Sequence, residues 1–261
     1  MTDDLRFAIL IDAENISSKY IKLILEEVAG EGIATYRRIY GDWTSSLLAS
    51  WKQVLLDYSI TPIQQYSYTA GKNSTDSAMI IDAMDILYSG KVDGFCLVTS
   101  DSDFTRLAMR LREAGMTVIG MGEQKTPRPF IAACNQFKFI DMLFKEQMEP
   151  AEPTQAAAAD PVSVQGPEDT PSQTNQQTIK KAMVEFIESR SDEDGWMLVS
   201  ELGNLLRKRY ADFDVRNFGY KKMVPFIKSL GVFEVRSEMD TANLRSPNSQ
   251  VVYVRLRNNR N

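Results

Sequence analysis

Two aspartates, Asp101 and Asp103, stand directly after an apolar run that begins at Phe95. The run is too short for a convincing helix and is typical of a buried strand in a parallel sheet. Hydroxyl side chains surround the two carboxylates and belong to Thr99, Ser100 and Ser102. Ligand sites of open α/β sheets lie outside the carboxyl ends of the strands. The residues at this strand end therefore predict a site that holds a metal ion or a phosphate.

Other strand ends carry acids as well. Asp12 follows the apolar run Phe7–Ile11, and Asp76 stands at the start of the helix expected after the third strand. In a parallel sheet these ends open onto one edge, so four carboxylates can converge there, those of Asp12, Asp76, Asp101 and Asp103. Clustered carboxylates repel one another unless a divalent cation binds, and hard oxygen ligands suit Mg²⁺ or Mn²⁺. Such ions activate water and stabilise an in-line phosphodiester displacement.

Polar neighbours are expected to support this site. The candidates that could orient water, hold a phosphate or position a ligand are Asn15, Lys72, Asp82, Thr99, Ser100 and Ser102. Helix capping is the alternative explanation, because aspartate and serine at a helix start accept hydrogen bonds from free amides. Capping accounts for Asp103 or Asp76 taken singly. The agreement of three strand ends favours a common site.

The chain contains no histidine and only two cysteines, Cys96 and Cys134. This composition excludes Ser-His-Asp and Cys-His triads and any histidine-containing zinc site. An enzyme of this composition must use carboxylates, hydroxyls, lysines or a hard metal. The cysteines are typical of reduced core residues. The acidic N-terminus and the absence of any long apolar run predict a cytoplasmic protein that does not bind membranes.

Apolar runs alternate with helical patterns through the N-terminal part of the chain. The expected strands cover residues 7–11, 34–40, 60–66, 95–98, 116–121 and 137–140, and the main helices between them cover residues 18–29, 47–58, 76–88 and 104–113. This alternation predicts an α/β fold with a doubly wound parallel sheet and right-handed crossovers.

The composition changes twice along the chain, and the changes predict three segments. Residues 1–145 form the α/β domain, and residues 146–177, with six acids and no basic residue, form a disordered acidic linker. Residues 178–261 form a second domain, in which 15 Lys/Arg exceed 11 Asp/Glu. Three helical patterns, 179–187, 196–210 and 218–230, precede two strand patterns, 232–235 and 251–254. This order is typical of a small winged-helix α+β domain. Pro225 should delay the start of its third helix.

Basic and aromatic residues of the second domain are the candidates for RNA binding. They are Arg207, Lys208, Arg209, Tyr220, Lys221, Lys222 and Lys228, with Arg236, Arg245, Arg255 and Arg257 on or near the wing. Lysine and arginine contact phosphates, and tyrosine stacks on unpaired bases. A solvated helical face is the alternative for any single lysine.

Three sequence blocks resemble the signature of the NYN domain family, which is related to PIN and FLAP-type nucleases. The blocks are Ile9–Asn15, Gly71–Asp76 and Leu97–Phe104. The resemblance implies a metal-dependent ribonuclease fold, with Asp12, Asp76, Asp101 and Asp103 as its acids. It also matches Asn15 to the asparagine of the first block and Asp82 to a further acidic position.

The segments Asp194–Leu202, Phe218–Met223 and Leu230–Val235 resemble the OST-HTH or LOTUS domain. That resemblance implies a winged helix that binds RNA or a protein partner. Together, these features predict an Mg²⁺- or Mn²⁺-dependent ribonuclease with an RNA-recruiting module. Two alternatives remain: a non-catalytic RNA-binding adaptor with a vestigial acidic pocket, and another carboxylate-metal enzyme of the Toprim or phosphatase type. The sequence does not predict the oligomeric state.

Overall fold

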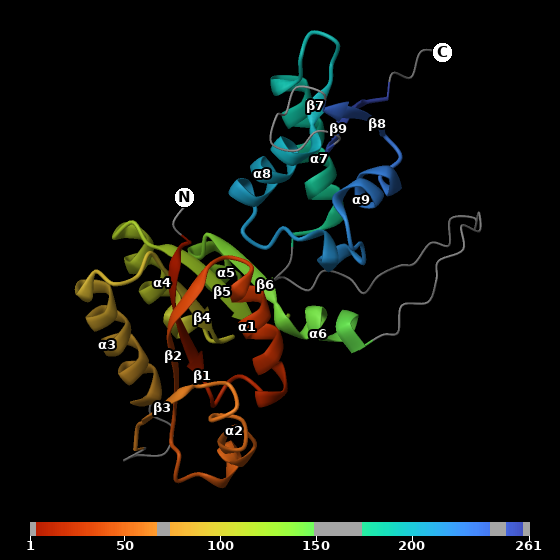
Figure 1. Cartoon of the computed structure of the whole chain (residues 1–261). Helices are drawn as coiled ribbons and strands as arrows, with labels where there is room; N and C mark the ends of the chain where they lie inside the picture. The colour runs from red at the N-terminus through yellow and green to blue at the C-terminus, as the bar shows by residue number, and fades with distance from the viewer. Residues whose placement is uncertain (1–3, 67–73, 149–173, 241–248, 258–261) are drawn as a thin grey trace. The chain divides into compact units, whose positions relative to one another are not determined.

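The computed structural model describes residues 4–66, 74–148, 174–240 and 249–257 (Figure 1). The chain divides into two compact units, and the boundary falls between Gln173 and Thr174. The elements of the N-terminal unit are β1 (Arg6–Asp12), α1 (Ile21–Ala29), β2 (Ile33–Gly41), α2 (Ala49–Lys52), β3 (Thr61–Gln64), α3 (Ser74–Ser89), β4 (Gly94–Val98), α4 (Thr105–Glu113), β5 (Thr117–Gly122), α5 (Arg128–Ala133), β6 (Gln136–Phe139) and α6 (Ile140–Met148), with short 3₁₀ turns η1 (Ser18–Tyr20), η2 (Ser46–Leu48) and η3 (Ser102–Phe104).

The six strands form one parallel sheet in the order β3-β2-β1-β4-β5-β6, which confirms the predicted doubly wound α/β class. The strand order reverses between β1 and β4, because the chain runs outward from β1 in one direction and returns to β4 on its other side. A reversal of this kind leaves a crevice at the carboxyl ends of the two central strands. Asp12 ends β1, and Asp101 follows β4.

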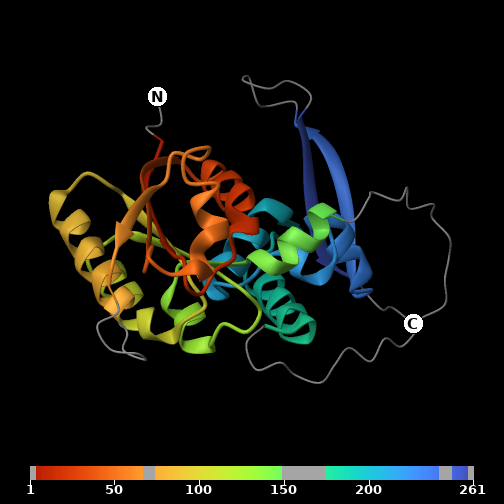
Figure 2. The same ribbon diagram turned by 90° about the horizontal axis from the view of Figure 1, so that it is seen from below.

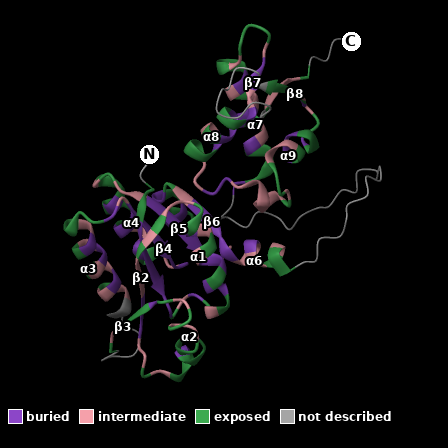
Figure 3. Cartoon of the chain, in the orientation of Figure 1, coloured by how far each residue is buried: buried purple, intermediate pink, exposed green. Residues whose placement is uncertain are grey.

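Alternating side chains of the central strands build two cores, one on each face of the sheet. Phe7, Ile9 and Ile11 of β1 pack in a core with α1, α2 and α6. Ala8 and Leu10 face the opposite core, which contains side chains of α3, α4 and α5. Figure 1 shows α1 and α6 on one side of the sheet and α3 and α4 on the other, and Figure 3 shows the buried strands between them. The crevice therefore rests on strands that are fixed by packing on both faces.

A glycine at the end of β5 lets the neighbouring loop approach closely. A Cβ on Gly122 would lie 2.6 Å from the carbonyl oxygen of Thr99 and 2.6 Å from the hydroxyl of Thr126. The Thr99 carbonyl belongs to the backbone, so it cannot shift to make room without disturbing the end of β4. Glycine at this position therefore allows the β4 strand end to lie against β5.

The C-terminal unit combines helices with a small antiparallel sheet of order β7-β9-β8, as expected for the second domain. Its elements are α7 (Gln176–Arg190), β7 (Met197–Leu198), α8 (Val199–Arg209), η4 (Val215–Phe218), α9 (Met223–Ser229), β8 (Phe233–Asp240) and β9 (Ser249–Leu256). Figure 2 shows β8 and β9 as a long two-stranded ribbon. Ile179, Leu202, Phe226 and Val254 pack together in the core of the unit.

Several predicted element boundaries are wrong. The helix expected over residues 47–58 is limited to η2 and α2, and turns follow from Gln53. The third helix of the C-terminal unit begins at Met223, later than the pattern over 218–230, which confirms the late start predicted from Pro225. Residues Val215–Phe218 form η4 instead, and Gly219 ends it in the left-handed conformation with φ 79°. Pro225 then lies in the first turn of α9, where a missing N–H removes no intrahelical bond.

The ends of the predicted linker are helical, since α6 continues to Met148 and α7 begins at Gln176. Residues 149–173 lie outside the described part of the chain, as do residues 67–73 between β3 and α3. Within the described ranges, no helix is long and apolar enough to cross a membrane.

Candidate metal centre and basic surface

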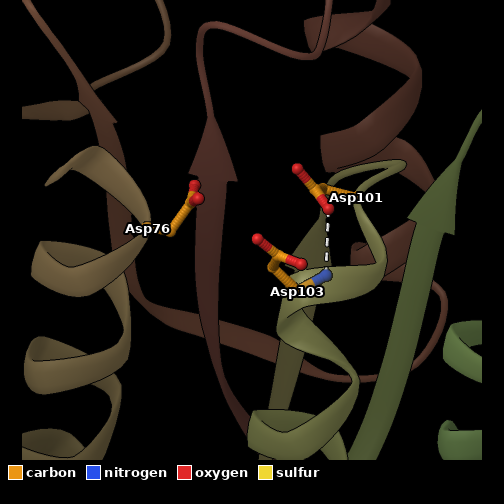
Figure 4. A group of neighbouring side chains, drawn as sticks. All are labelled: Asp76, Asp101 and Asp103. Carbon is orange, nitrogen blue, oxygen red and sulfur yellow. Dashed lines mark hydrogen bonds between the residues drawn. The ribbon is translucent and has the colours of Figure 1, made fainter. Parts of the chain in front are cut away.

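Three of the predicted acids converge at the carboxyl edge of the parallel sheet. One carboxylate oxygen from each of Asp76, Asp101 and Asp103 lies within 4.8 Å of the others. Figure 4 shows Asp76 reaching from the first turn of α3 toward the two aspartates that come after β4. Asp76 and Asp101 are half-buried, whereas Asp103 is exposed. The cluster is therefore accessible to solvent on the side of Asp103.

The turn after β4 fixes the relative positions of Asp101 and Asp103. Asp101 is the N-cap of η3, and its Oδ1 accepts a hydrogen bond of 2.9 Å from the backbone N–H of Asp103. The predicted capping role is therefore present, and it occupies one carboxylate oxygen. Oδ2 of Asp101 and the carboxylate of Asp103 have further acceptor capacity. This capping bond stabilises the turn and also holds the carboxylates of Asp101 and Asp103 close to each other.

The fourth predicted acid, Asp12, is not part of this converging group and is only 4% exposed. Its Oδ1 accepts hydrogen bonds from the backbone N–H groups of Glu14 and Asn15, at 3.1 and 3.2 Å. Its Oδ2 accepts one of 3.0 Å from the hydroxyl of Thr99. The buried Thr99 hydroxyl also accepts a bond of 3.1 Å from the N–H of Asp101. Thr99 thus joins the two central strand ends.

Two of the acids hold protons more tightly than ordinary aspartates do. Burial raises the pKa of Asp12 from 3.8 to about 6 and is opposed by the hydrogen bond from Thr99, while repulsion by Asp76 adds to the increase. Burial also raises the pKa of Asp76 to about 6, with repulsion from Asp101, Asp103 and Glu14. The charge of Asp76 therefore contributes to the raised pKa of Asp12. A bound cation would relieve this repulsion.

The other predicted supporting residues lie at varying distances from the cluster. The Ser100 hydroxyl accepts a bond of 2.9 Å from the N–H of Glu123 and so ties the β4 end to the loop after β5. Ser102 is exposed in the first turn of η3. Asp82 lies further along α3 and contacts Arg38 and Tyr40 of β2. Lys72 lies outside the described residues.

The predicted site did not include two glutamates that lie at the same edge. Glu14 follows Asp12, and its charge contributes to the raised pKa of Asp76. Glu123 follows β5 directly, and its backbone N–H donates to the Ser100 hydroxyl. Both glutamates stand just beyond a strand end, as Asp101 does, so the same criterion could have found them. The structure also shows that the Oδ1 atom of Asn15 is buried and has no hydrogen-bond partner among the described residues.

The predicted RNA-binding residues of the C-terminal unit have different environments. Lys208 is exposed at the end of α8, and Lys221, Lys222 and Lys228 are exposed beside or on α9. Arg207 is exposed and donates to Asn204 at 2.7 Å. Four lysines of this surface therefore present their side chains to solvent.

Arg209 and Tyr220 make contacts within the unit. Arg209 pairs with Glu185 of α7 at 2.7 Å, and its guanidinium lies 5.5 Å from the centre of the Phe186 ring. The Tyr220 ring packs edge-on against Phe226 at 5.6 Å between centroids. These contacts give both residues a structural role that needs no RNA.

The wing arginines lie against aromatic rings of the small sheet. Arg236 of β8 and Arg255 of β9 place their guanidinium carbons 4.3 and 4.4 Å from the centre of the Trp196 ring. The pairs Arg236–Glu238 and Arg255–Glu234 balance their charges. Arg257 is exposed after β9, and Arg245 lies outside the described residues.

The donor set of the acidic cluster fits a hard divalent cation. All three converging groups offer carboxylate oxygens, and oxygen ligands with open positions suit Mg²⁺ or Mn²⁺. The protein is thus a doubly wound α/β protein with a carboxylate site at its topological switch point and an appended winged-helix unit.

The family comparison agrees with this description. The family model described as the NYN domain matches residues 6–143, and the model described as the OST-HTH/LOTUS domain matches residues 175–243. The chain belongs to the NYN domain family and carries an OST-HTH/LOTUS domain, as its sequence blocks indicated. It combines a nuclease-like domain with a domain of an RNA-binding type.

No curated protein matches the chain. Among solved structures, the chain is similar to a protein of unknown function from Vibrio parahaemolyticus. The identity is 20% and the TM-score is 0.45, and the match covers 54% of this chain and 96% of the Vibrio chain.

Proposed function

We propose that this protein is a ribonuclease that depends on Mg²⁺ or Mn²⁺ and that its C-terminal unit recruits the RNA. The convergence of Asp76, Asp101 and Asp103 within 4.8 Å at the switch point carries the proposal. The nuclease-like family of the N-terminal unit supports it. When bound, the ion supplies a Lewis acid that activates water and stabilises charge on the phosphate.

The residues of the chain have distinct roles in this proposal. Asp76, Asp101 and Asp103 hold the ion, and exposed Asp103 lies where solvent and substrate enter. Asp12 adds buried negative charge at the end of β1, where Thr99 links it to Asp101. Thr99 keeps the two strand ends in register through its bonds to Asp12 and Asp101. The site needs no histidine, in agreement with the composition.

Recruitment of RNA by a separate unit would offset the repulsion between the acidic site and the phosphates of RNA. A cluster of carboxylates repels the phosphates of its own substrate until the ion is bound. The exposed lysines at positions 208, 221, 222 and 228 can hold RNA through phosphate contacts. We propose that RNA first binds this surface and that its cleavage occurs at the acidic site.

The decisive experiment compares cleavage of end-labelled RNA by the full chain and by Asp101→Asn, with Mn²⁺, Mg²⁺ or EDTA. Asparagine keeps an oxygen that can cap the N–H of Asp103 but removes the charge. We expect metal-dependent cleavage by the wild type and its loss in the variant, with unchanged RNA affinity. Equal cleavage by both proteins would reject the proposed site. RNA binding without cleavage by either protein would favour a non-catalytic adaptor.

A further inference from the structure

Helix α4 carries a basic stripe that begins beside the acidic cluster. Asp103 lies in η3, and η3 runs directly into α4, so Asp103, Arg106 and Arg110 occupy successive turns. Figure 4 shows Asp103 at the top of this helical segment. Side chains three or four residues apart on a helix are neighbours, with about 5–6 Å between their Cβ atoms. The first arginine therefore stands one turn from the exposed acid of the cluster.

Both guanidinium groups of the stripe are exposed and have donors to spare. Arg106 makes no hydrogen bond or ion pair with the described residues. Arg110 donates from Nη2 to the hydroxyl of Tyr88 on α3 at 3.3 Å, and no carboxylate within the described ranges pairs with it. A guanidinium that makes one such bond keeps several further N–H donors. The stripe can therefore bind an anion without breaking an ion pair.

A third arginine of the same helix has a structural role and provides a contrast. Nη1 of Arg112 donates to the carbonyl oxygens of Ala132 and Ala133 at 3.2 and 3.1 Å. These bonds satisfy carbonyls at the end of α5 and link α5 to α4. Arg106 and Arg110 make no comparable bond to a neighbouring backbone, so the packing of α4 does not require their charges.

The chemistry and spacing of the stripe suit the backbone of a nucleic acid. The planar fork of a guanidinium matches two oxygens of a phosphate. Arg106 and Arg110 are four residues apart, which corresponds to about 6 Å along the helix axis. Successive phosphates of a strand have a similar separation. A strand with one phosphate at the acidic cluster can therefore place the following phosphates along α4.

We propose that Arg106 and Arg110 bind the phosphates next to the one that the acidic cluster holds, and so position the RNA strand for cleavage. The inference rests on the proposed function for its biological meaning, although contact between RNA and these arginines can be measured without cleavage. The lysine surface of the C-terminal unit captures RNA, whereas the stripe acts on RNA that is already captured. Loss of the stripe should therefore lower kcat, and loss of the lysines should raise KM.

The first arm of the test measures cleavage of single-stranded RNA with Mn²⁺ by the full chain carrying Arg106→Ala and Arg110→Ala. We expect kcat to fall about tenfold, as when a hydrogen bond to a charged group is lost, with KM unchanged. Alanine favours a helix, so the fold should persist. Arg106→Lys with Arg110→Lys keeps the charges and should recover part of the loss.

The matched control carries Lys22→Ala and Lys145→Ala. Both lysines are exposed, on α1 and α6, which pack against the opposite face of the sheet. The control removes the same charge from the same unit, and both kcat and KM should stay at the wild-type values. An equal fall of kcat in the two double variants would mean that net charge alone acts, which overturns the inference.

The second arm needs no cleavage. The full chain with Asp101→Asn is treated with phenylglyoxal, which modifies accessible arginines, at saturating Mn²⁺ with and without single-stranded RNA. Peptide mass spectrometry follows each arginine. We expect RNA to slow the modification of Arg106 and Arg110 severalfold and to leave Arg112, which the carbonyls of α5 hold, unchanged.

The two arms together separate this inference from the proposed function. Protection of both arginines with a lower kcat in their double variant supports the inference. Wild-type kcat in that variant, with equal modification in the presence and absence of RNA, overturns the stripe and leaves the nuclease standing. Protection by RNA without cleavage by the wild type supports the phosphate contacts and rejects the proposed function.

Discussion

In the N-terminal unit, the charged residues proposed to act on RNA come from distant points of the chain and meet at one place. Asp76, Asp101 and Asp103 converge because parallel strands end at one edge. In the C-terminal unit, the basic residues come mainly from two short stretches around α8 and α9, and they spread over an exposed surface. Clustered carboxylates destabilise the folded protein by repulsion, which a bound cation would offset. Exposed lysines are solvated and destabilise it little. A site built by the fold should therefore fail when one residue changes, and a surface should weaken gradually.

The sharpest test of this contrast is Asp76→Asn in the acidic site. We expect RNA cleavage to fall by about 10²–10³-fold, a typical loss when one charge-stabilising group is removed. RNA affinity should stay unchanged, because the proposed binding surface lies in the other unit. Cleavage rate and filter binding measure the two effects separately.

The control for this substitution is Asp85→Asn. Asp85 lies on the same helix, α3, but is exposed and outside the cluster. It removes the same charge from the same element and should leave cleavage within about twofold, as expected for a screened surface charge. Equal losses of cleavage in both variants would mean that only the net charge of α3 matters. The acidic residues would then act as a charged surface and not as a site that depends on each residue.

The Thr99 bridge should show a large effect on stability. Thr99→Val leaves Oδ2 of Asp12 and the N–H of Asp101 without their hydroxyl partner in a buried position. We expect the free energy of unfolding of the N-terminal unit to fall by about 2–3 kcal/mol, the cost of leaving buried polar groups unpaired. Urea denaturation followed by circular dichroism measures it, and Thr99→Ser, which keeps the hydroxyl, should recover most of the loss. A Thr99→Val protein as stable as wild type would show that the bridge does not hold the strand ends.

The basic surface should respond in smaller steps. Lys221→Ala with Lys222→Ala removes two exposed charges, and we expect RNA affinity to fall about tenfold at moderate salt. The slope of log K against log salt should decrease by about 1.4, or 0.7 for each lost phosphate contact on a single strand. Fluorescence anisotropy over a salt series measures both quantities.

Arg209→Ala is the comparison variant for the lysine substitutions, because it removes a positive charge that already has a partner within the unit. Arg209 already pairs with Glu185 and lies over the Phe186 ring. Its loss should leave the urea midpoint almost unchanged, because an exposed ion pair contributes little to stability, and it should leave the salt slope unchanged. A drop in the slope equal to that of a lysine variant would show that Arg209 leaves Glu185 to bind phosphate.

The sequence predicts well the features that topology dictates. Runs such as Phe7–Ile11 specify buried parallel strands, and parallel strands bring Asp76 and Asp101 to one edge whatever the details of packing. It does not predict which atoms are already engaged. The three hydrogen bonds of Asp12 depend on the path of the adjoining turn and on the orientation of Thr99. Likewise, Arg209 and Glu185 meet only because α7 and α8 pack together, and no local pattern encodes that contact.

The smallest expected effect is the pH dependence of the metal-free protein, and it distinguishes repelling acids from solvated charges. Asp12 and Asp76 have pKa values of about 6 in the folded chain, raised from 3.8. Between pH 4 and 6 the folded state binds more protons than the unfolded state, so stability falls as pH rises. The stabilisation is complete below about pH 4 and is lost as pH rises through 6.

Asp76→Asn should remove part of this dependence, because it deletes one raised pKa and lowers the repulsion on Asp12. At pH 7.5 without metal, we expect the variant to be more stable than wild type by on the order of 1 kcal/mol, after allowance for solvent screening, and the difference should vanish near pH 4. Urea midpoints of wild type, Asp76→Asn and Asp85→Asn at the two pH values measure this. Added Mn²⁺ should reverse the order at pH 7.5, since only wild type keeps the full ligand set. If wild type were more stable than Asp76→Asn without metal, the acids would not repel one another. The acidic site would then resemble the basic surface, with charges that solvent screens independently.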